Sequence, residues 1–431
     1  MNKEETLMKK LVALVLAMLL AIGAFTAVAE AEPVKLTFWT FQELHTEFMQ
    51  AMVDAWNAIP ENTAIELDMQ VYPYDEMHDK LTIALQTGEG APDIVDIEIN
   101  KFANYLNGDI QLAELNSYVE DDLDKLVVSR FNNYAKDGKF YGIDYHIGII
   151  SAFYNDKLLS EAGIDYKEIK TWDDLHEAGK QYLEATGKPI ITFETGDCWS
   201  IYPMLTQHGA DLLSLDNEVR MEEEVFVNTL AFVKEMVDDG TAIPTPGGNH
   251  HAEEYYGWMN AGGAAAVVMP FWYIDRFTNY MPDLAGQMKI AAMPVWTDGG
   301  HKTSQGGGTG TAVVKTGAYC DLACQFLTYA KTSYDGAINL WKICGFDPIR
   351  TDVYSDPIMQ EDNKFFQYYG ENFFEVLTGM MDDVADTAIT SEYPKAVDVV
   401  KSQMMYDLLI VGKDAATAAA DAAEEVRSLI Y

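Results

Sequence analysis

The feature that most constrains the fold is the stretch 138–172, GKFYGIDYHIGIISAFYNDKLLSEAGIDYKEIKTW. Apolar residues at alternate positions predict a strand with one buried face: Tyr141, Ile143, Tyr145, Ile147, Ile149 and Phe153. A helix is expected directly after it, because the Asn-Asp pair at 155–156 can cap a helix and Gly163 suits a left-handed stop. Thr171 then predicts a further helix, with a capping box. The strand therefore leads into a new helical layer.

The chain alternates strands with helices on both sides of this stretch. Before it, the patterns predict strands at 34–41, 65–72 and 93–99 and helices at 44–58 and 75–86. After it, they predict strands at 189–193, 264–269 and 289–295 and helices at 199–208, 222–239, 273–280, 322–332 and 414–430. Such alternation predicts parallel strand pairing and an α/β layer architecture.

Length sets the number of domains, and charge argues against a nucleic-acid partner. The 431 residues suffice for two or three domains with well-buried cores. The formal net charge of −39 repels phosphate backbones, so we expect no nucleic-acid partner.

Residues 8–31 are typical of a secretory signal, with two lysines, the apolar run Leu11–Ile22 and small residues after it. This run is too short to favour a membrane span, and no later stretch offers about 18 uninterrupted apolar residues. No cysteine lies near the expected cleavage site. We therefore expect a protein without a lipid anchor, in a periplasm or outside the cell.

The four cysteines are Cys198, Cys320, Cys324 and Cys344. An oxidising compartment permits a disulfide between Cys344 and Cys320 or Cys324, and the sequence leaves pairing and free thiols both open. A zinc site is disfavoured, because Cys320 and Cys324 lie on one helix face without histidines nearby in the sequence.

Three motifs in order carry a family resemblance. G-K-x-Y-G-x begins at Gly138, Y-N followed by A-G-I covers 154–164, and T-W-x-x-L covers 171–175. In this order they resemble the domain-crossing segment of the extracytoplasmic solute-binding proteins of carbohydrate ABC transporters, the family that includes maltose-binding protein. The resemblance extends to GEGAPDIV at 88–95, AGGAAAVVMPFWYID at 261–275 and ACQFL at 323–327 after a glycine-rich strand.

The resemblance implies a two-lobe α/β fold of the type II periplasmic-binding-protein kind, with three hinge crossings. A signal peptide at 1–31 would precede lobe one, from 32–143 and 306–346, and lobe two, from 144–305 and 347–431. It implies a monomeric protein that captures a sugar or oligosaccharide in the interlobe cleft and delivers it to an ABC transporter permease in the membrane. No enzymatic activity, cofactor or metal is expected.

Polar and aromatic side chains follow four predicted strands, at the edge where open α/β sheets bind ligands. Aromatic rings can pack on the apolar face of a sugar, and carboxylates can accept bonds from its hydroxyls. The resemblance places stacking aromatics at two of these positions, Trp199 and Trp272. At Asn100 this chain departs from the acid of maltose-binding relatives. The full set of strand-end candidates is Phe41, Glu43, Glu98, Asn100, Asp197, Trp199, Trp272 and Asp275.

The predicted crossings contain three further candidates. Asp144 and His146 lie in the first crossing, and Arg350 lies in the third. Each could bind the ligand or only hold the crossing backbone. Asp197 and Asp275 suit helix caps equally well.

Two other classes of function stay open from the sequence. Polyamines, ferric ion and glycerol phosphate are bound by proteins of the same general fold. A secreted glycoside hydrolase would need a carboxylate pair, but among 68 acidic residues such pairs arise without a function. The cluster His250, His251, Glu253 and Glu254 lacks the spacing of a metal-binding helix.

Overall fold

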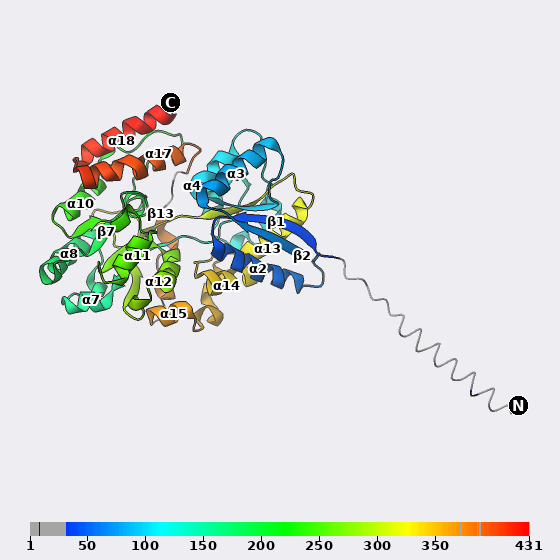
Figure 1. Cartoon of the computed structure of the whole chain (residues 1–431), viewed down its shortest axis with the longest axis horizontal. Helices are drawn as coiled ribbons and strands as arrows, with labels where there is room; N and C mark the ends of the chain where they lie inside the picture. The colour runs from blue at the N-terminus through cyan, green and yellow to red at the C-terminus, as the bar shows by residue number, and fades with distance from the viewer. Residues whose placement is uncertain (1–7, 9–31, 371–372, 386, 388, 431) are drawn as a thin grey trace.

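The computed structural model describes residues 8, 32–370, 373–385, 387 and 389–430. Apart from Met8, the predicted secretory signal lies outside these residues. The chain forms two groups of elements joined by extended segments (Figure 1). We call the group around the four-stranded sheet lobe 1 and the group around the three-stranded sheet lobe 2. The exact residue boundaries predicted for the lobes stay a prediction.

Lobe 1 is built on the sheet β12-β3-β1-β2. Strand β1 (Val34–Thr40) runs parallel to β2 (Ile65–Val71) and β3 (Ile94–Glu98), and β12 (Thr309–Val313) is antiparallel to β3. Helix α2 (Glu43–Asn57) buries Phe48, Met52 and Trp56, which recur at every fourth position on one face of the helix. The other helices of the lobe are α3 (Tyr74–Thr87), α4 (Ile99–Phe102), α5 (Asn116–Val119), α6 (Ser129–Asn132), α13 (Cys320–Thr332) and α14 (Tyr334–Cys344). The short strands β4 (Ala135–Lys136) and β5 (Lys139–Phe140) form a hairpin.

Lobe 2 is built on the antiparallel sheet β10-β6-β9, from β6 (Ile150–Asn155), β9 (Ala266–Pro270) and β10 (Met288–Ala292). Strands β7 (Ile191–Phe193) and β8 (Ala242–Pro244) pair in parallel beside it, and β11 (Thr303–Ser304) pairs with β13 (Val384–Ala385). Helices surround them (Figure 1): α7 (Asp156–Glu161), α8 (Trp172–Thr186), α9 (Tyr202–Gln207), α10 (Glu224–Asp238), α11 (Glu253–Asn260), α12 (Ile274–Tyr280), α15 (Lys364–Tyr369), α16 (Phe374–Thr378), α17 (Tyr393–Val399) and α18 (Ala415–Ile430).

The local helix signals of the 138–172 stretch are confirmed. The Asn155 side chain accepts a bond from the Leu158 backbone at the start of α7. Gly163 has a φ of +76° after that helix. Thr171 and Asp174 form the predicted capping box at the start of α8.

Extended segments from three parts of the chain meet between the lobes. We call residues 141–149 crossing 1, residues 303–309 crossing 2 and residues 345–350 crossing 3. Single antiparallel bridges join Ile149 to Gln305 and His146 to Pro348. The predicted one-sided burial of crossing 1 is wrong, because residues 141–155 are all buried. Crossings 2 and 3 and the adjoining cores cover both of its faces.

The C-terminal part of the chain returns to the space between the lobes. Helix α17 continues as π-helical turns at Val400–Met404 and Asp407–Val411, and α18 packs back on it. The start of this segment lies beside α4 of lobe 1 (Figure 1). Lobe 2 therefore reaches lobe 1 through α17 as well as through the crossings.

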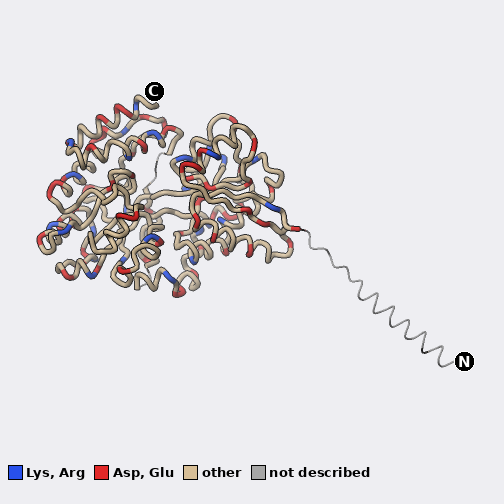
Figure 2. The backbone as a smooth tube through the Cα atoms, viewed as in Figure 1, with Lys and Arg blue, Asp and Glu red and all other residues tan. Residues whose placement is uncertain are grey.

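The surface is acidic over both lobes (Figure 2), as 68 acidic against 29 basic residues predict. Among the described residues, no helix combines the length and apolar character that a membrane crossing requires. All four cysteines are free.

Candidate ligand-binding site

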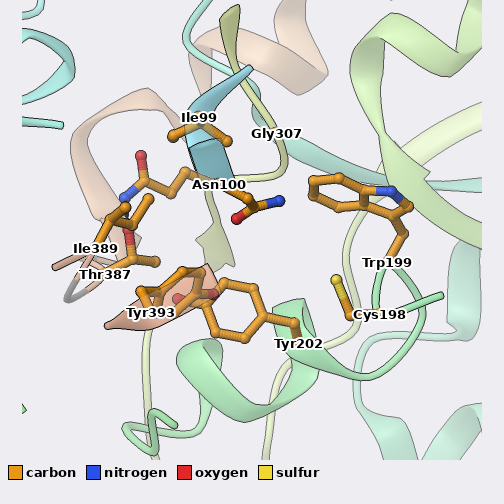
Figure 3. Close-up of a pocket in the computed structure, with 10 residues that line it drawn as sticks. Ile99, Asn100, Cys198, Trp199, Tyr202, Gly307, Thr387, Ile389 and Tyr393 are labelled. Carbon is orange, nitrogen blue, oxygen red and sulfur yellow. Dashed lines mark hydrogen bonds between the residues drawn. The ribbon is translucent and has the colours of Figure 1, made fainter. Parts of the chain in front are cut away.

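A small pocket, with a cavity volume of about 10 Å³, lies between the lobes (Figure 3). Lobe 1 provides the start of α4, and lobe 2 provides the turn before α9 and the segment that leads into α17. Crossing 2 contributes the remaining part of the wall. The lining residues are Ile99, Asn100, Cys198, Trp199, Tyr202, Gln305, Gly307, Thr387, Ile389 and Tyr393.

Two tryptophans from lobe 2 meet at this pocket. The rings of Trp199 and Trp272 are perpendicular, with centroids 6.2 Å apart. The indole Nε1 of Trp272 donates a bond of 3.0 Å to the carbonyl of Gly306. Gly307 follows with a φ of +73°, and a Cβ there would lie 3.2 Å from Trp272 Nε1 and 3.4 Å from Trp199 Cη2. The backbone of crossing 2 therefore contacts both rings directly. Only glycine permits this approach without strain.

Asn100 forms part of the facing wall in lobe 1, and the buried Glu98 is bonded to it. Glu98 ends β3 and caps α4, accepting bonds from the Asn100 backbone at 2.8 Å, the Asn100 amide at 3.0 Å and the Tyr74 hydroxyl at 3.0 Å. Burial raises the pKa of Glu98 to about 7. The Asn100 amide points toward the Trp199 ring (Figure 3). An amide thus faces an aromatic ring across the pocket, and a buried acid is bonded to that amide.

The turn that carries Trp199 is fixed by a buried acid, Glu194. Its carboxylate accepts bonds from the backbones of Ser200, at 3.1 Å, and His250, at 2.8 Å. Burial, followed by the nearby charge of Asp197, raises the pKa of Glu194 to about 8. The Ser200 bond joins the two ends of the turn, and the His250 bond ties the turn to a neighbouring segment, so Glu194 fixes the backbone on either side of Trp199.

Asp197 lies in the same turn and faces a cation. Its carboxylate is 3.6 Å from Lys401 Nζ, which comes from the π-helical turns after α17, and it accepts a bond of 3.3 Å from Asn249. The negative charges of Asp197 and Glu98 both act on Lys401 and raise its pKa against the effect of burial, which lowers it. This end of the site is polar, whereas the rings occupy the other end.

Asp144 and His146 lie in the hinge, away from the pocket lining. Asp144 is ion-paired with Arg130 and accepts a bond of 2.6 Å from the Tyr134 hydroxyl. Burial alone would raise the pKa of Asp144, but the Arg130 guanidinium, together with His146 and the bond from Tyr134, outweighs burial and lowers the pKa to about 2. His146 is buried beside Phe346, and burial lowers its pKa to about 3. Both side chains contact the crossing rather than the space between the lobes.

The remaining sequence-predicted residues are dispersed. Phe41 packs behind the pocket wall, with its ring centroid 5.3 Å from that of Tyr74. Glu43 is exposed at the start of α2. Asp275 is bonded to Arg276 and Asn279 of its own helix. Arg350 pairs with Asp122 and Asp352 in lobe 1. A ligand role for these four residues, as for the others, stays a prediction.

Sequence reasoning missed several wall residues, above all Tyr202 and Tyr393. Their rings pack edge to face with centroids 5.6 Å apart (Figure 3). With 24 tyrosines in the chain, no local pattern distinguishes these two. Gly307 could have been predicted from the sequence, because a run of glycines in a predicted crossing indicates close backbone approach.

Comparison with known proteins agrees with this geometry. Residues 42–333 match the family described as bacterial extracellular solute-binding protein. The chain is 43% identical over 404 residues to the arabinooligosaccharide-binding protein of Bacillus subtilis, covering 92% of this chain and 93% of that protein. It is 43% identical over 381 residues to the protein of the same name from Halalkalibacterium halodurans, covering 87% and 84%.

A solved structure extends the likeness to the fold. The GacH receptor of Streptomyces glaucescens, solved without ligand and with acarbose, superimposes with a TM-score of 0.76 at 21% identity, covering 92% of this chain and 98% of that one. The two-lobe type II fold predicted from the sequence is confirmed by this likeness. With a family match over most of its length and two relatives well above 30% identity, the chain belongs to the bacterial extracellular solute-binding proteins.

Proposed function

We propose that the chain captures an oligosaccharide containing arabinose between its lobes and delivers it to an ABC transporter permease. The observation that carries this proposal is the interlobe pocket in which Trp199, whose ring packs against Trp272, faces Asn100, whose amide is bonded to Glu98. A sugar presents an apolar face to rings and hydroxyls to acids and amides. The 43% identity to two arabinooligosaccharide-binding proteins supports arabinose as the sugar.

The size of the pocket supports capture by lobe closure. Its cavity volume of about 10 Å³ is close to the space that one water molecule needs and far below the roughly 300 to 1,000 Å³ of ligand pockets. A ligand of several sugar rings therefore enters only when the lobes separate. Contacts to both walls then favour the closed form, which shifts the population of the two states.

The proposal places the protein outside the cytoplasmic membrane, after removal of residues 1–31 as a secretory signal. Capture and delivery break no bond in the sugar. Incubation with arabinotriose should therefore release no new reducing ends. Reducing ends that accumulate in proportion to protein would instead favour a glycoside hydrolase.

Calorimetric titration of the purified protein tests the ligand. We expect a micromolar Kd for arabinotriose, which corresponds to about 8 kcal/mol, and binding at least about a hundredfold weaker for maltotriose, spermidine and ferric ion. Tighter binding of spermidine or iron than of any sugar would overturn the proposal. Tighter binding of maltotriose would overturn only the choice of arabinose.

Protons released on binding should report on Glu98. A sugar hydroxyl that donates to this carboxylate favours its charged form, so binding lowers a pKa that is about 7 in the free protein. Lys401 and Asp197 from lobe 2 and Tyr74 from α3 act on the same carboxyl. We therefore expect proton release at pH 7 and an affinity that rises severalfold from about pH 6 to about pH 8.

Titrations at pH 7 in two buffers of different ionisation enthalpy measure this release. The variant Glu98→Gln keeps the shape of the side chain and should abolish it. Equal heats in both buffers for the unaltered protein would show that Glu98 does not contact the ligand.

A further inference from the structure

Crossing 2 has contacts of two kinds at neighbouring residues. The carbonyl of Gly306 accepts the bond from Trp272 Nε1 on the pocket side. The carbonyl of Gly307, one residue on, accepts a bond of 2.9 Å from Arg130 Nη2 on the hinge side. The same two-residue stretch therefore touches a pocket ring and a buried cation.

Arg130 holds two crossings at once. It belongs to α6 of lobe 1, and only 2% of the residue is exposed. Its Nε and Nη2 donate to Asp144 of crossing 1, and its Nη1 donates to the side chain of Gln305 in crossing 2. With the bond to Gly307, its planar fork fixes the position of crossing 2 relative to crossing 1.

Gln305 extends this network into the pocket wall. Its Oε1 also accepts a bond of 3.2 Å from Asn133, and its Nε2 donates to the Thr387 hydroxyl. Gln305 and Thr387 both line the pocket. The Arg130 guanidinium is therefore bonded to two residues that line the pocket, Gly307 and Gln305.

We propose that Arg130 is a positioning residue for ligand capture, because it holds Gln305 and Gly307 where Trp199 and Trp272 can pack against crossing 2. This inference rests on the proposed function, since Arg130 lies outside the pocket lining and acts on the ligand only through crossing 2. The residue is in lobe 1, whereas both tryptophans are in lobe 2. Arg130 therefore contributes to the relative position of the two lobes in which the pocket is complete.

The variant Arg130→Lys tests whether the planar guanidinium of Arg130 is needed to position crossing 2. Lysine keeps a positive charge beside the buried Asp144, so the carboxylate stays paired, but one ammonium does not reproduce the planar set of bonds to Gln305 and Gly307. In the protein without ligand, the amides of Gly306 and Thr309, which are bonded to Gly148 and Asp144, should exchange hydrogen about fivefold faster or more. Arabinotriose should bind about fivefold more weakly or worse.

A matched control lies in the same buried cluster. Tyr134→Phe removes one bond to Asp144 and leaves the Arg130 contacts to crossing 2 in place. We expect its affinity for arabinotriose to stay within about twofold of the unaltered protein, even where its melting temperature falls as far as that of Arg130→Lys. An equal loss of affinity in both variants would show that Arg130 only stabilises the buried cluster, and it would overturn the inference.

Unchanged exchange at Gly306 and Thr309 in Arg130→Lys would also overturn it. If Arg130→Lys does not fold, Gln305→Ala removes the acceptor of Nη1 while the Arg130 pair with Asp144 remains, and the same exchange measurement applies. The exchange experiment needs no ligand. If the unaltered protein binds no arabinotriose but exchange is faster in Arg130→Lys, the proposed ligand is wrong. The claim that Arg130 positions crossing 2 is then still supported.

Discussion

Trp199→Ala and Trp272→Ala should each weaken binding of arabinotriose at least tenfold while the protein stays folded. A tenfold loss corresponds to about 1.4 kcal/mol, which is within the contribution of one buried aromatic anchor. Both rings are only partly buried, so their removal leaves no large enclosed cavity. Calorimetry gives the affinity, and circular dichroism reports the fold.

Trp296→Ala is the control for these two variants. Trp296 is also a partly buried tryptophan of lobe 2 whose Nε1 donates to a backbone carbonyl, that of Met204 at 3.2 Å. It stacks on His208 and is not among the pocket residues. Its replacement should leave the affinity unchanged. Unchanged affinity in both Trp199→Ala and Trp272→Ala would show that the ligand binds elsewhere.

Gly308→Ala should destabilise the protein by about 3 kcal/mol or more. Gly308 has a φ of +157°, and a Cβ there would lie 2.5 Å from Arg130 Nη2 and Tyr134 Oη and 2.7 Å from Asp144 Oδ2. These atoms are held by their own buried bonds, so the clash is relieved only by breaking the ion pair or shifting crossing 2. Urea unfolding followed by tryptophan fluorescence measures the loss.

Gly187→Ala separates backbone strain from this clash. Gly187 ends α8 with a φ of +71°, and no atom lies within 4 Å of a Cβ built there. We expect it to lose only about 1 kcal/mol, the usual effect of a left-handed residue that is not glycine. An equal loss in Gly187→Ala and Gly308→Ala would show that crossing 2 is not tightly enclosed.

The elements of the fold could be predicted because their signals are local. The capping box at Thr171 and the stop at Gly163 depend on residues within one turn, and both are present. The two-residue hydrophobic period gave a wrong prediction of burial in crossing 1. Asp144 and His146 alternate with apolar residues there but are buried as well. Their burial depends on distant segments: Arg130 neutralises Asp144, and crossing 3 packs against His146.

The pocket could be predicted only in part for the same reason. Trp199 and Asn100 follow strand ends, which sequence patterns can locate. Tyr393 reaches the pocket because the C-terminal segment returns to α4, and no nearby residue indicates that return. The partner of Arg350, Asp122, comes from a part of lobe 1 that is remote in the sequence, so this ion pair was not visible in the sequence.

Small-angle scattering of the protein with and without saturating arabinotriose tests most directly whether two lobes close on a sugar. Separation of the lobes is required for entry, and contacts from both walls favour closure, so the radius of gyration should fall when the sugar is added. At a sugar concentration near the Kd of the unaltered protein, the scattering curve of Trp199→Ala should stay close to that of the open form. Identical curves with and without sugar, under conditions where calorimetry shows the site to be filled, would contradict capture between the lobes.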